Sequence, residues 1–393
     1  MANGKPGPAK KPPILEKQLQ GFQYVRMIGS FLERLRPDAS DPKRKLFYDQ
    51  YVTLLLFRFF NPTISSLRGI QHVTGFEKVQ RKLGVRRTSL GSLSEATQVF
   101  DPDRLVEVIQ DLSAQARPLK IDPRLEQIGS VLTAVDGTLL KALPRMIWAL
   151  WVDEEHRAAK AHVHFEVLKG IPVRADITAG SASEKTALRK ALEPGRLYIL
   201  DRGYAEYALF GEILAAGSSV VGRVQSNAVT ETIEERTLSS EARSAGVFAD
   251  RVVRLGGPAT REGLRDPVRM VEVRFQKGNG EETVLHLVTD RLDLPAEVVA
   301  LIFKYRWQVE LFFRWLKCIL GCRHLLSLSR EGVTIQVYAA IIASLLISVC
   351  TGLKPTKRTF ETICLYFQGW ASEEELLDHI RLRMGKEAAS QKS

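Results

Sequence analysis

The chain has 393 residues, of which 45% are apolar and 26% charged, so it can bury a sizeable core and is not a disordered protein. Its length predicts more than one domain, or one core with large additions. The formal net charge of +11 favours a polyanionic partner such as nucleic acid, although a merely soluble basic protein has the same balance. Four cysteines without CxxC spacing indicate neither a disulfide framework nor a zinc site, which fits a reducing compartment.

The N-terminal third is predicted to be helical. Residues 1–13 (MANGKPGPAKKPP) lack the apolar core of a signal peptide and have the composition of a disordered basic tail. Residues 14–125 contain long apolar runs with helical periodicity and cap signals. Within them, a short helix, a turn and a second helix carry a basic cluster, an arrangement compatible with docking on DNA and equally with a solvated face. The cluster consists of Lys78, Arg81, Lys82, Arg86 and Arg87.

From residue 126 the pattern changes to that of β-strands. IGSVLTAVDGTLL is apolar and β-like, KAHVHFEVL and IPVRADITAG alternate, and GRLYILDRGY is an apolar strand that ends on a carboxylate. Helices are predicted at SEKTALRKAL and AEYALFGEILAAG, and a further strand at SSVVGRV. Together these elements predict an α/β unit with a mixed sheet over residues 126–222.

The second half of the chain is predicted to interrupt and then complete this unit. Residues 223–290 are expected to form a β-rich insertion of two or three strands, with Gly278-Asn279-Gly280 as a hairpin signal. Helices resume over 291–350, and 351–393 is predicted to be a helical C-terminal region. The uncharged run at 337–353 is shorter than the roughly 20 residues that span a bilayer, so we expect a buried core helix and no membrane association.

Two carboxylates, Asp136 and Asp201, close apolar strands. Burying an ionised side chain is costly unless a partner pairs with it. A glycine follows each of them, directly at 137 and one residue later at 203, and we expect it to let the chain turn away sharply. One such aspartate is usually a turn cap. Two such aspartates in one sheet, together with a helical glutamate flanked by basic residues, are much less common.

That glutamate is Glu310, in the segment KYRWQVELFFRWLK. Arg306 lies four residues before it and Lys317 seven after it, so helical spacing puts the three side chains on roughly one face. A solvated stripe is the simplest interpretation. Combined with the two aspartates, however, hard oxygen ligands in this number suit Mg²⁺ or Mn²⁺ rather than zinc. Two such ions can activate a water or a 3′-hydroxyl in phosphoryl transfer on nucleic acid, while the two basic side chains hold phosphates.

The chain resembles the DDE-type transposases of bacterial insertion sequences, in the insertion-sequence-four family. That family carries a Tyr-(2)-Arg-(3)-Glu-(6)-Lys signature, which Arg306, Glu310 and Lys317 match. VDG at 135–137, DRGY at 201–204, KAHVHFEVLKGIPV and the TDR before the last helices resemble the family as well. The likeness covers about 126–350 closely and 14–125 more loosely. The signature's Tyr falls on Phe303, which cannot donate a hydrogen bond to a phosphate, and we expect it to stack on a base.

The resemblance implies an RNase H-like catalytic core interrupted by the β-rich insertion and preceded by the helical DNA-binding region. It implies that Asp136, Asp201 and Glu310 bind two Mg²⁺ or Mn²⁺ ions and catalyse cut-and-paste movement of an insertion sequence. Water attack would nick double-stranded DNA at the terminal inverted repeats, and the freed 3′-hydroxyl would attack the opposite strand, in some members through a hairpin, and later the target. The implied assembly is a homodimer on DNA in the bacterial cytoplasm. The expected DNA-contacting residues are Arg306, Lys317, Arg202, Tyr204, Phe303, Arg81, Lys82, Arg86 and Arg87.

Other interpretations stay open. A stand-alone or domesticated RNase H-like nuclease would have the same triad without pairing DNA ends. A sequence-specific repressor whose core has lost activity is less favoured, because the triad is intact. Two carboxylates also serve glycosidases, but the basic helix gives no reason for one. His162 and His164 lie on one face of a strand, as metal ligands can, but no third ligand is evident, so we expect them to pack against the sheet.

Overall fold

The structure is a computed structural model of the chain. The residues that it describes are 29–35, 45–119, 121–153, 156–257, 261–276 and 282–389. The basic tail predicted at 1–13 and the glycine turn predicted at 278–280 lie outside these residues.

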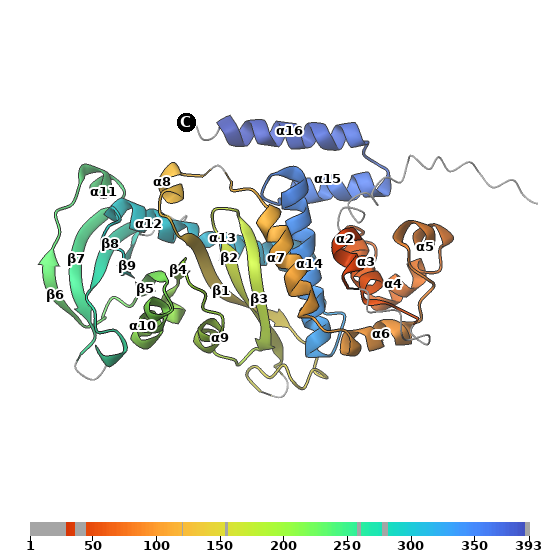
Figure 1. The fold of residues 1–393 in the computed structure, drawn as a ribbon, viewed down its shortest axis with the longest axis horizontal. Coiled ribbons are helices and arrows are strands. Elements are labelled where there is room, and N and C mark those ends of the chain that lie inside the picture. The colour runs from red at the N-terminus through yellow and green to blue at the C-terminus, as the bar shows by residue number, and fades with distance from the viewer. Residues whose placement is uncertain are drawn as a thin grey trace, which may run out of the picture.

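A nine-stranded mixed sheet runs through the protein in the order β3-β2-β1-β4-β5-β9-β8-β7-β6 (Figure 1). β1, β2 and β3 form an antiparallel meander, and β4 and β5 run parallel to β1. The sheet confirms the mixed α/β class expected from the sequence. Its strands are β1 (Val131–Lys141), β2 (Ala158–Glu166), β3 (Ile171–Ala179), β4 (Arg196–Leu200), β5 (Ser219–Val224), β6 (Thr230–Glu235), β7 (Val247–Leu255), β8 (Val268–Gln276) and β9 (Glu282–Thr289).

The β-rich segment extends the core sheet instead of forming a sheet of its own. β9 pairs antiparallel with β5, and β8, β7 and β6 follow outward as an antiparallel ladder. The segment has four strands where the sequence predicted two or three. β8 and β9 are paired as far as Gln276 opposite Glu282, which agrees with the predicted hairpin. β6 forms the outer edge with an exposed, acidic sequence, and such charge on an edge strand discourages further strand pairing.

Helices flank this sheet and form a lobe at the β3 side, as Figure 1 shows. Those before the sheet are α2 (Gly29–Glu33), α3 (Tyr48–Phe59), α4 (Leu67–Val73), α5 (Glu77–Leu83), α6 (Leu90–Val99), α7 (Arg104–Gln115) and α8 (Pro123–Glu126). Those within and after it are α9 (Glu184–Lys190), α10 (Tyr207–Ala215), α11 (Ser240–Ser244), α12 (Ala296–Tyr305), α13 (Trp307–Arg314), α14 (Arg330–Thr351), α15 (Lys357–Gln368) and α16 (Glu373–Ala389).

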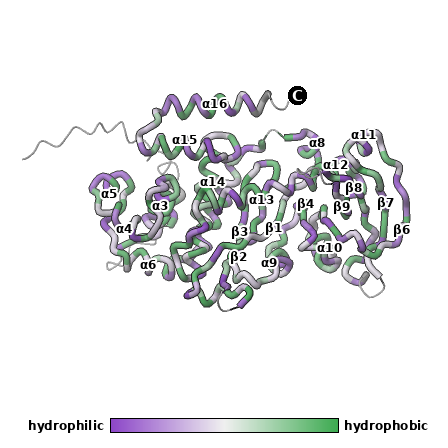
Figure 2. The backbone as a smooth tube through the Cα atoms, turned by 180° about the vertical axis from the view of Figure 1, so that it is seen from behind, coloured by the Kyte–Doolittle hydropathy of each residue, from purple (hydrophilic) through white to green (hydrophobic). Residues whose placement is uncertain are grey.

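α14 is the central helix of the core. It is long and apolar enough to cross a membrane, yet 83% of its most apolar window is buried inside the protein, as expected for a core helix. It packs against β3, α3 and α7, so the helical N-terminal region shares one apolar core with the sheet. Figure 2 shows α14 between the N-terminal helices and the strands, with α15 next to its end and α16 beyond α15 at the edge of the molecule. The N-terminal helices are therefore held in place by the same core that supports the strands.

Candidate active site

Asp136 and Asp201 lie side by side because β1 and β4 are parallel neighbours. The last pair of the β1–β4 ladder joins Val135 to Leu200, so the next residue of each strand is a carboxylate. Arg223 takes the same level on β5, the next parallel strand. Its guanidinium lies 3.6 Å from Asp201 Oδ1. Three adjacent parallel strands thus place Asp136, Asp201 and Arg223 next to one another in a row.

The prediction that Asp136 ends its strand is wrong. β1 continues to Lys141 with β2 beside it, and only β4 stops short of Asp136. Gly137 therefore continues the strand and does not turn the chain, and neither Gly137 nor Gly203 has a positive φ. Asp201 does follow the end of its strand, because β4 ends one residue earlier and a 3₁₀ turn begins at the next.

The helix expected around Glu310 is two helices. α12 ends at Tyr305 and α13 begins at Trp307, with Arg306 between them. The Arg306 guanidinium contacts two carboxylates: it donates to Glu310 Oε1 at 2.6 Å and lies 3.6 Å from Asp136 Oδ2. The one-face arrangement expected for Arg306 and Glu310 is present as an ion pair, and the same arginine links this helix pair to β1.

Lys317 also reaches β1. It lies in a π-helical turn, Trp315–Ile319, that follows α13. Its Nζ donates to Thr138 Oγ1 at 2.9 Å. Thr138 is two residues after Asp136 and so faces the same side of the strand. Arg306, Glu310 and Lys317 therefore gather over one stretch of β1, as the helical spacing predicted.

The environment of Asp136 favours its protonated form. Burial raises the pKa of the Asp136 carboxyl to about 6, against the opposing effects of the Gly137 N–H and Arg306. Glu184 and Glu310 raise it further because they are carboxylates nearby. Sequence reasoning missed Glu184 and Arg223 alike. In the sequence, Glu184 is an ordinary residue of the helix capped by Ser183, which is α9.

These residues have the oxygen ligands that a hard divalent cation requires. Asp201 Oδ1 is buried and has no hydrogen-bond partner among the described residues. The Arg223 guanidinium, 3.6 Å away, lies beyond hydrogen-bond distance, so this buried oxygen remains available to a cation. Within the described ranges, no three Asp, Glu, His or Cys side chains lie close enough to form a ready-made metal site. Instead, Arg306 contacts both Asp136 and Glu310.

Arg202 and Tyr204, both predicted to contact DNA after Asp201, differ in exposure. Arg202 is exposed. Tyr204 is 1% exposed and packs in the apolar cluster around α10, and no described residue pairs with its hydroxyl. In this structure a DNA strand can reach Arg202 but not Tyr204, because the phenol is inside the fold.

Phe303 is also buried. It lies in α12, is 8% exposed and belongs to the main core. The Arg306 guanidinium lies 5.7 Å from the centroid of its ring, within the range of a cation–π contact. Packing is therefore what the structure shows for this position, and base stacking by Phe303 stays a prediction.

His162 and His164 are buried in β2, as expected. Burial lowers the pKa of His162 to about 4 and that of His164 to about 3, so both are neutral at pH 7. His162 Nε2 lies 2.8 Å from Thr178 Oγ1 on β3. Neither belongs to a metal-binding group of described residues.

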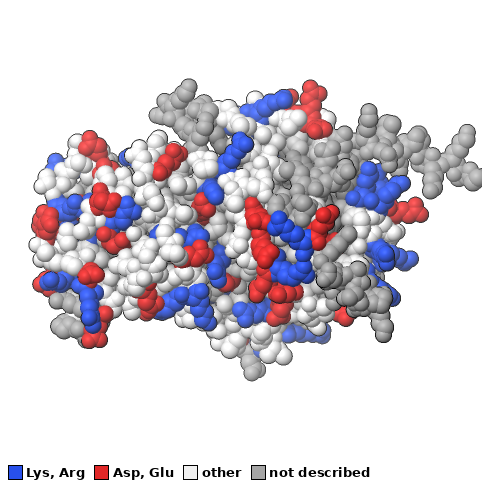
Figure 3. Space-filling model, in the orientation of Figure 1, with Lys and Arg blue, Asp and Glu red and all other residues white. Residues whose placement is uncertain are grey.

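The basic cluster of the N-terminal region lies on α5 and in the segment that follows it. Arg81, Arg86 and Arg87 are exposed, and Lys82 is half-buried. Figure 3 shows basic side chains gathered at the end of the molecule where α4 and α5 lie, whereas acidic and basic side chains alternate over the rest of that face. The cluster thus forms a separate basic surface away from β1 and β4 (Figure 1).

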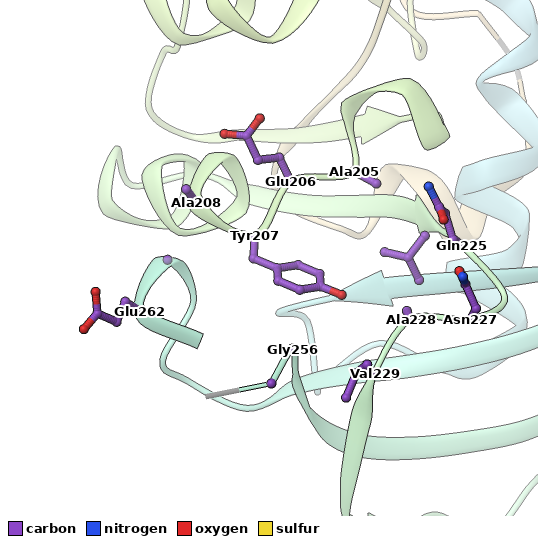
Figure 4. Close-up of a pocket in the computed structure, with 13 residues that line it drawn as sticks. Ala205, Glu206, Tyr207, Ala208, Gln225, Asn227, Ala228, Val229, Gly256 and Glu262 are labelled. Atoms are coloured by element: carbon purple, nitrogen blue, oxygen red, sulfur yellow. The ribbon is translucent and has the colours of Figure 1, made fainter. Parts of the chain in front are cut away.

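A cavity of about 670 Å³ lies beside the turn that follows Asp201 (Figure 4). Residues 205–208 form one wall, and Gln225, Asn227 and Glu262 contribute polar groups. Figure 4 shows the Tyr207 ring extending into this space from the start of α10. Asp136, Asp201 and Glu310 are not among the lining residues, so the cavity adjoins the carboxylates without containing them.

Comparison with known proteins gives a consistent family. The chain is 32% identical over 199 residues to a protein named as a candidate transposase, y4zB, of Sinorhizobium fredii, covering 50% of this chain and 54% of that protein. It is 26% identical over 218 residues to a candidate transposase for insertion sequence element IS5377 of Geobacillus stearothermophilus, covering 55% of each chain. The chain thus spans about half the length of these two relatives.

Two further likenesses cover more of the chain. A candidate transposase for insertion sequence element IS4SA of Synechocystis is 20% identical over 83% of this chain and 91% of that protein. A solved structure of the piggyBac transposase synaptic complex with hairpin DNA aligns over 94% of this chain and 85% of that one, at 11% identity and a TM-score of 0.41. The family model described as "Transposase DDE domain" matches residues 128–346, more than half of the chain. The chain belongs to the transposase DDE domain family.

Proposed function

We propose that this protein is a DNA transposase that moves an insertion sequence by metal-dependent hydrolysis and transfer of phosphodiester bonds. The observation that carries the proposal is the placement of three acidic residues around the β1–β4 strand pair. Asp136 and Asp201 each come directly after the last paired residue of two neighbouring parallel strands. Arg306 links Glu310 to Asp136. Membership of the DDE domain family supports the same activity.

We infer that the core is RNase H-like. The supporting feature is the strand order β3-β2-β1-β4-β5, with an antiparallel meander followed by two strands parallel to the first. The β-rich segment enters after β5, as the sequence resemblance implies. The match of Arg306, Glu310 and Lys317 to the family signature supports membership of the insertion-sequence-four branch.

Asp136, Asp201 and Glu310 are proposed to hold two Mg²⁺ or Mn²⁺ ions. Such ions, when bound, activate the attacking hydroxyl or water and stabilise the leaving oxygen. The fit rests on the all-oxygen ligand set and on Asp201 Oδ1, which accepts no hydrogen bond from the described residues. Because Arg306 contacts Asp136 Oδ2 and Glu310 Oε1, a cation that takes either of these oxygens would displace it. The released guanidinium then becomes available to a DNA phosphate, together with Lys317 and the exposed Arg202.

The proposed substrate is double-stranded DNA, with the terminal inverted repeats as the cleaved ends and target DNA as the acceptor. A homodimer on DNA, in the bacterial cytoplasm, is the proposed working form, and the basic cluster on α5 is the proposed reader of the ends. The transposase names of the relatives favour this function over a stand-alone nuclease or a repressor.

Substitution of one triad member tests the proposal. Asp201→Asn removes the ligand charge and keeps the side-chain shape, so Mg²⁺-dependent cleavage of a duplex carrying the element's inverted repeat should be lost while gel retardation of that duplex persists. Asp378→Asn, an exposed carboxylate on α16 paired with Arg381, is the matched control and should cleave normally. Cleavage by the Asp201→Asn variant at the wild-type rate would overturn the proposed site.

A further inference from the structure

We propose that Glu184 is a fourth carboxylate of this site, a positioning residue that raises the affinity of Asp136 and Asp201 for a divalent cation. Glu184 begins α9, which packs against β1 and β2. The inference rests on the proposed function, because it assumes that the cation binds at the triad.

The Glu184 carboxylate lies directly against the backbone of Gly137. A Cβ added at Gly137 would lie 2.6 Å from Glu184 Oε1 and 2.9 Å from its Cδ, closer than real Cβ atoms approach. Since Gly137 has no positive φ, its missing side chain provides space rather than backbone freedom. Glu184 thus packs on Gly137, the residue immediately after Asp136.

The other carboxylate oxygen faces the second aspartate's turn. Glu184 Oε2 lies 3.9 Å from the position of a Cβ at Gly203, two residues after Asp201. Lys160 on β2 holds the first oxygen, with its Nζ 3.5 Å from Oε1, and donates to the Ala182 carbonyl. Glu184 is therefore fixed between the two segments that carry the aspartates.

Charge from α9 can act on Asp136 because the sheet is open at this point. Beyond Val135, β1 has no strand partner on its β4 side. Asp136 and Gly137 face opposite sides of β1, with Arg306 and Glu310 on one side and Glu184 on the other. The two glutamates thus approach the Asp136–Gly137 segment from the two faces of the sheet.

A second, independent observation points to a ligand here. The Tyr204 hydroxyl is buried and has no hydrogen-bond partner among the described residues. Burial raises the pKa of this phenol well above its usual value, and Glu184, Asp136 and Asp201 raise it further as nearby carboxylates, so the phenol lies beside the carboxylate cluster. A buried hydroxyl without a partner is costly. If the cluster held a hydrated cation, a bound water could donate to the phenol oxygen, and a carboxylate turned toward the phenol could accept from its O–H.

Groups that support metal ligands from behind typically change metal affinity by about 10–100-fold when they are substituted. Mn²⁺ binding to the full-length protein, measured by electron paramagnetic resonance with and without an inverted-repeat duplex, tests this for Glu184. We expect Glu184→Gln to weaken Mn²⁺ binding by about 10–100-fold, without lowering the melting temperature in EDTA. The control is Glu206→Gln, because Glu206 is paired with Lys185 and Arg189 outside the cluster, and it should bind Mn²⁺ as the wild type does.

Asp201→Asn separates the two proposals. If Asp201→Asn loses Mn²⁺ and Glu184→Gln binds it normally, the role of Glu184 is overturned while the proposed function stands. If both variants bind Mn²⁺ normally, or the wild type binds none in either state, the metal site itself is overturned and the role of Glu184 with it.

Gly137→Ala tests the contact between Gly137 and the Glu184 carboxylate from the other side. The added Cβ meets the end of a flexible side chain, so we expect it to displace the Glu184 carboxylate and reproduce the weakened Mn²⁺ binding of Glu184→Gln. In a Glu184→Ala background the clash is absent, so Gly137→Ala should have no further effect on Mn²⁺ affinity. An equal effect in both backgrounds would mean that the alanine acts on Asp136 directly, and it would overturn the proposed contact.

Discussion

Lys317 donates a 2.9 Å hydrogen bond to the hydroxyl of Thr138, which joins the end of the α12–α13 segment to the strand that carries Asp136. Thr138 is 8% exposed, so this acceptor is inside the protein. The lysine that the sequence assigns to DNA contact is therefore positioned by β1 before DNA arrives. Substitution of Thr138 and substitution of Lys317 therefore test different things: the first tests a structural role of Lys317, and the second tests a phosphate-binding role.

Thr138→Val removes the acceptor and keeps the shape of the side chain. We expect the free energy of unfolding to fall by about 0.5–1.5 kcal/mol, the usual net value of one hydrogen bond, while Thr138→Ser retains wild-type stability. Urea denaturation measures both. A valine variant as stable as the wild type would contradict the bond.

Lys317→Met should act on DNA instead. If Lys317 contacts a phosphate, its removal weakens binding of the inverted-repeat duplex and reduces the slope of log affinity against log salt by about 0.9, whereas Thr138→Val leaves that slope unchanged because the charge remains. Filter binding at several salt concentrations measures the slopes. A Lys317→Met slope equal to that of the wild type would show that Lys317 does not contact DNA.

Sequence reasoning found the acidic residues whose signals are local. Glu310 and Arg306 are four residues apart, and Asp201 follows an apolar strand directly. It missed Arg223 because the contact with Asp201 depends on how β4 and β5 are aligned, which no local pattern states. It missed Glu184 for the same reason, since α9 meets β1 only in the folded chain.

Two errors have a common physical cause. A glycine after an aspartate predicts a turn at Gly137, whereas the strand continues and the glycine makes room for a carboxylate. The sequence predicts two or three strands in the β-rich segment, whereas it has four, and β9 joins them to β5 through pairing between residues far apart in sequence. Local patterns give the type of an element, but its neighbours are decided by long-range packing and strand pairing.

Stability should fall in mild acid because of the buried histidines. The pKa of His164 is about 3 in the folded protein, against an ordinary value of 6.5. Between these values the unfolded chain binds a proton that the folded chain does not, so folding stability is full above pH 6.5 and is lost as the pH falls toward 3. His164→Gln should reduce this loss by up to about 1.4 kcal/mol per pH unit.

Denaturant unfolding at pH 7.5, 6 and 5 measures the effect, with His72→Gln, an exposed histidine on α4, as the control that keeps the wild-type pH dependence. The same pH dependence in His164→Gln and the wild type would show that His164 is not the group that titrates.

The basic cluster after α5 should contribute to DNA affinity through charge. Arg86 and Arg87 are exposed, so the double substitution to Gln should leave stability unchanged and reduce the salt slope of duplex binding by about 0.9 for each phosphate that the protein no longer neutralises. The full chain is required, because α3 and α7 of this region pack against α14. Arg381→Gln on α16 is the control. An unchanged slope in the double variant would show that the cluster lies outside the DNA interface.

Phe303 occupies the place of the signature's tyrosine, and its burial decides what substitution there should do. It packs in the main core, 8% exposed, with Arg306 over its ring. We therefore expect Phe303→Ala to lower the free energy of unfolding by about 3–5 kcal/mol, since it leaves a cavity, and Phe303→Leu to lower it less. If the ring stacks on a base instead, Phe303→Ala should weaken duplex binding by roughly 1–3 kcal/mol per folded molecule. Melting temperature and duplex affinity, measured on the same preparations, separate the two, and an alanine variant with the wild-type melting temperature and weakened binding would contradict the core assignment.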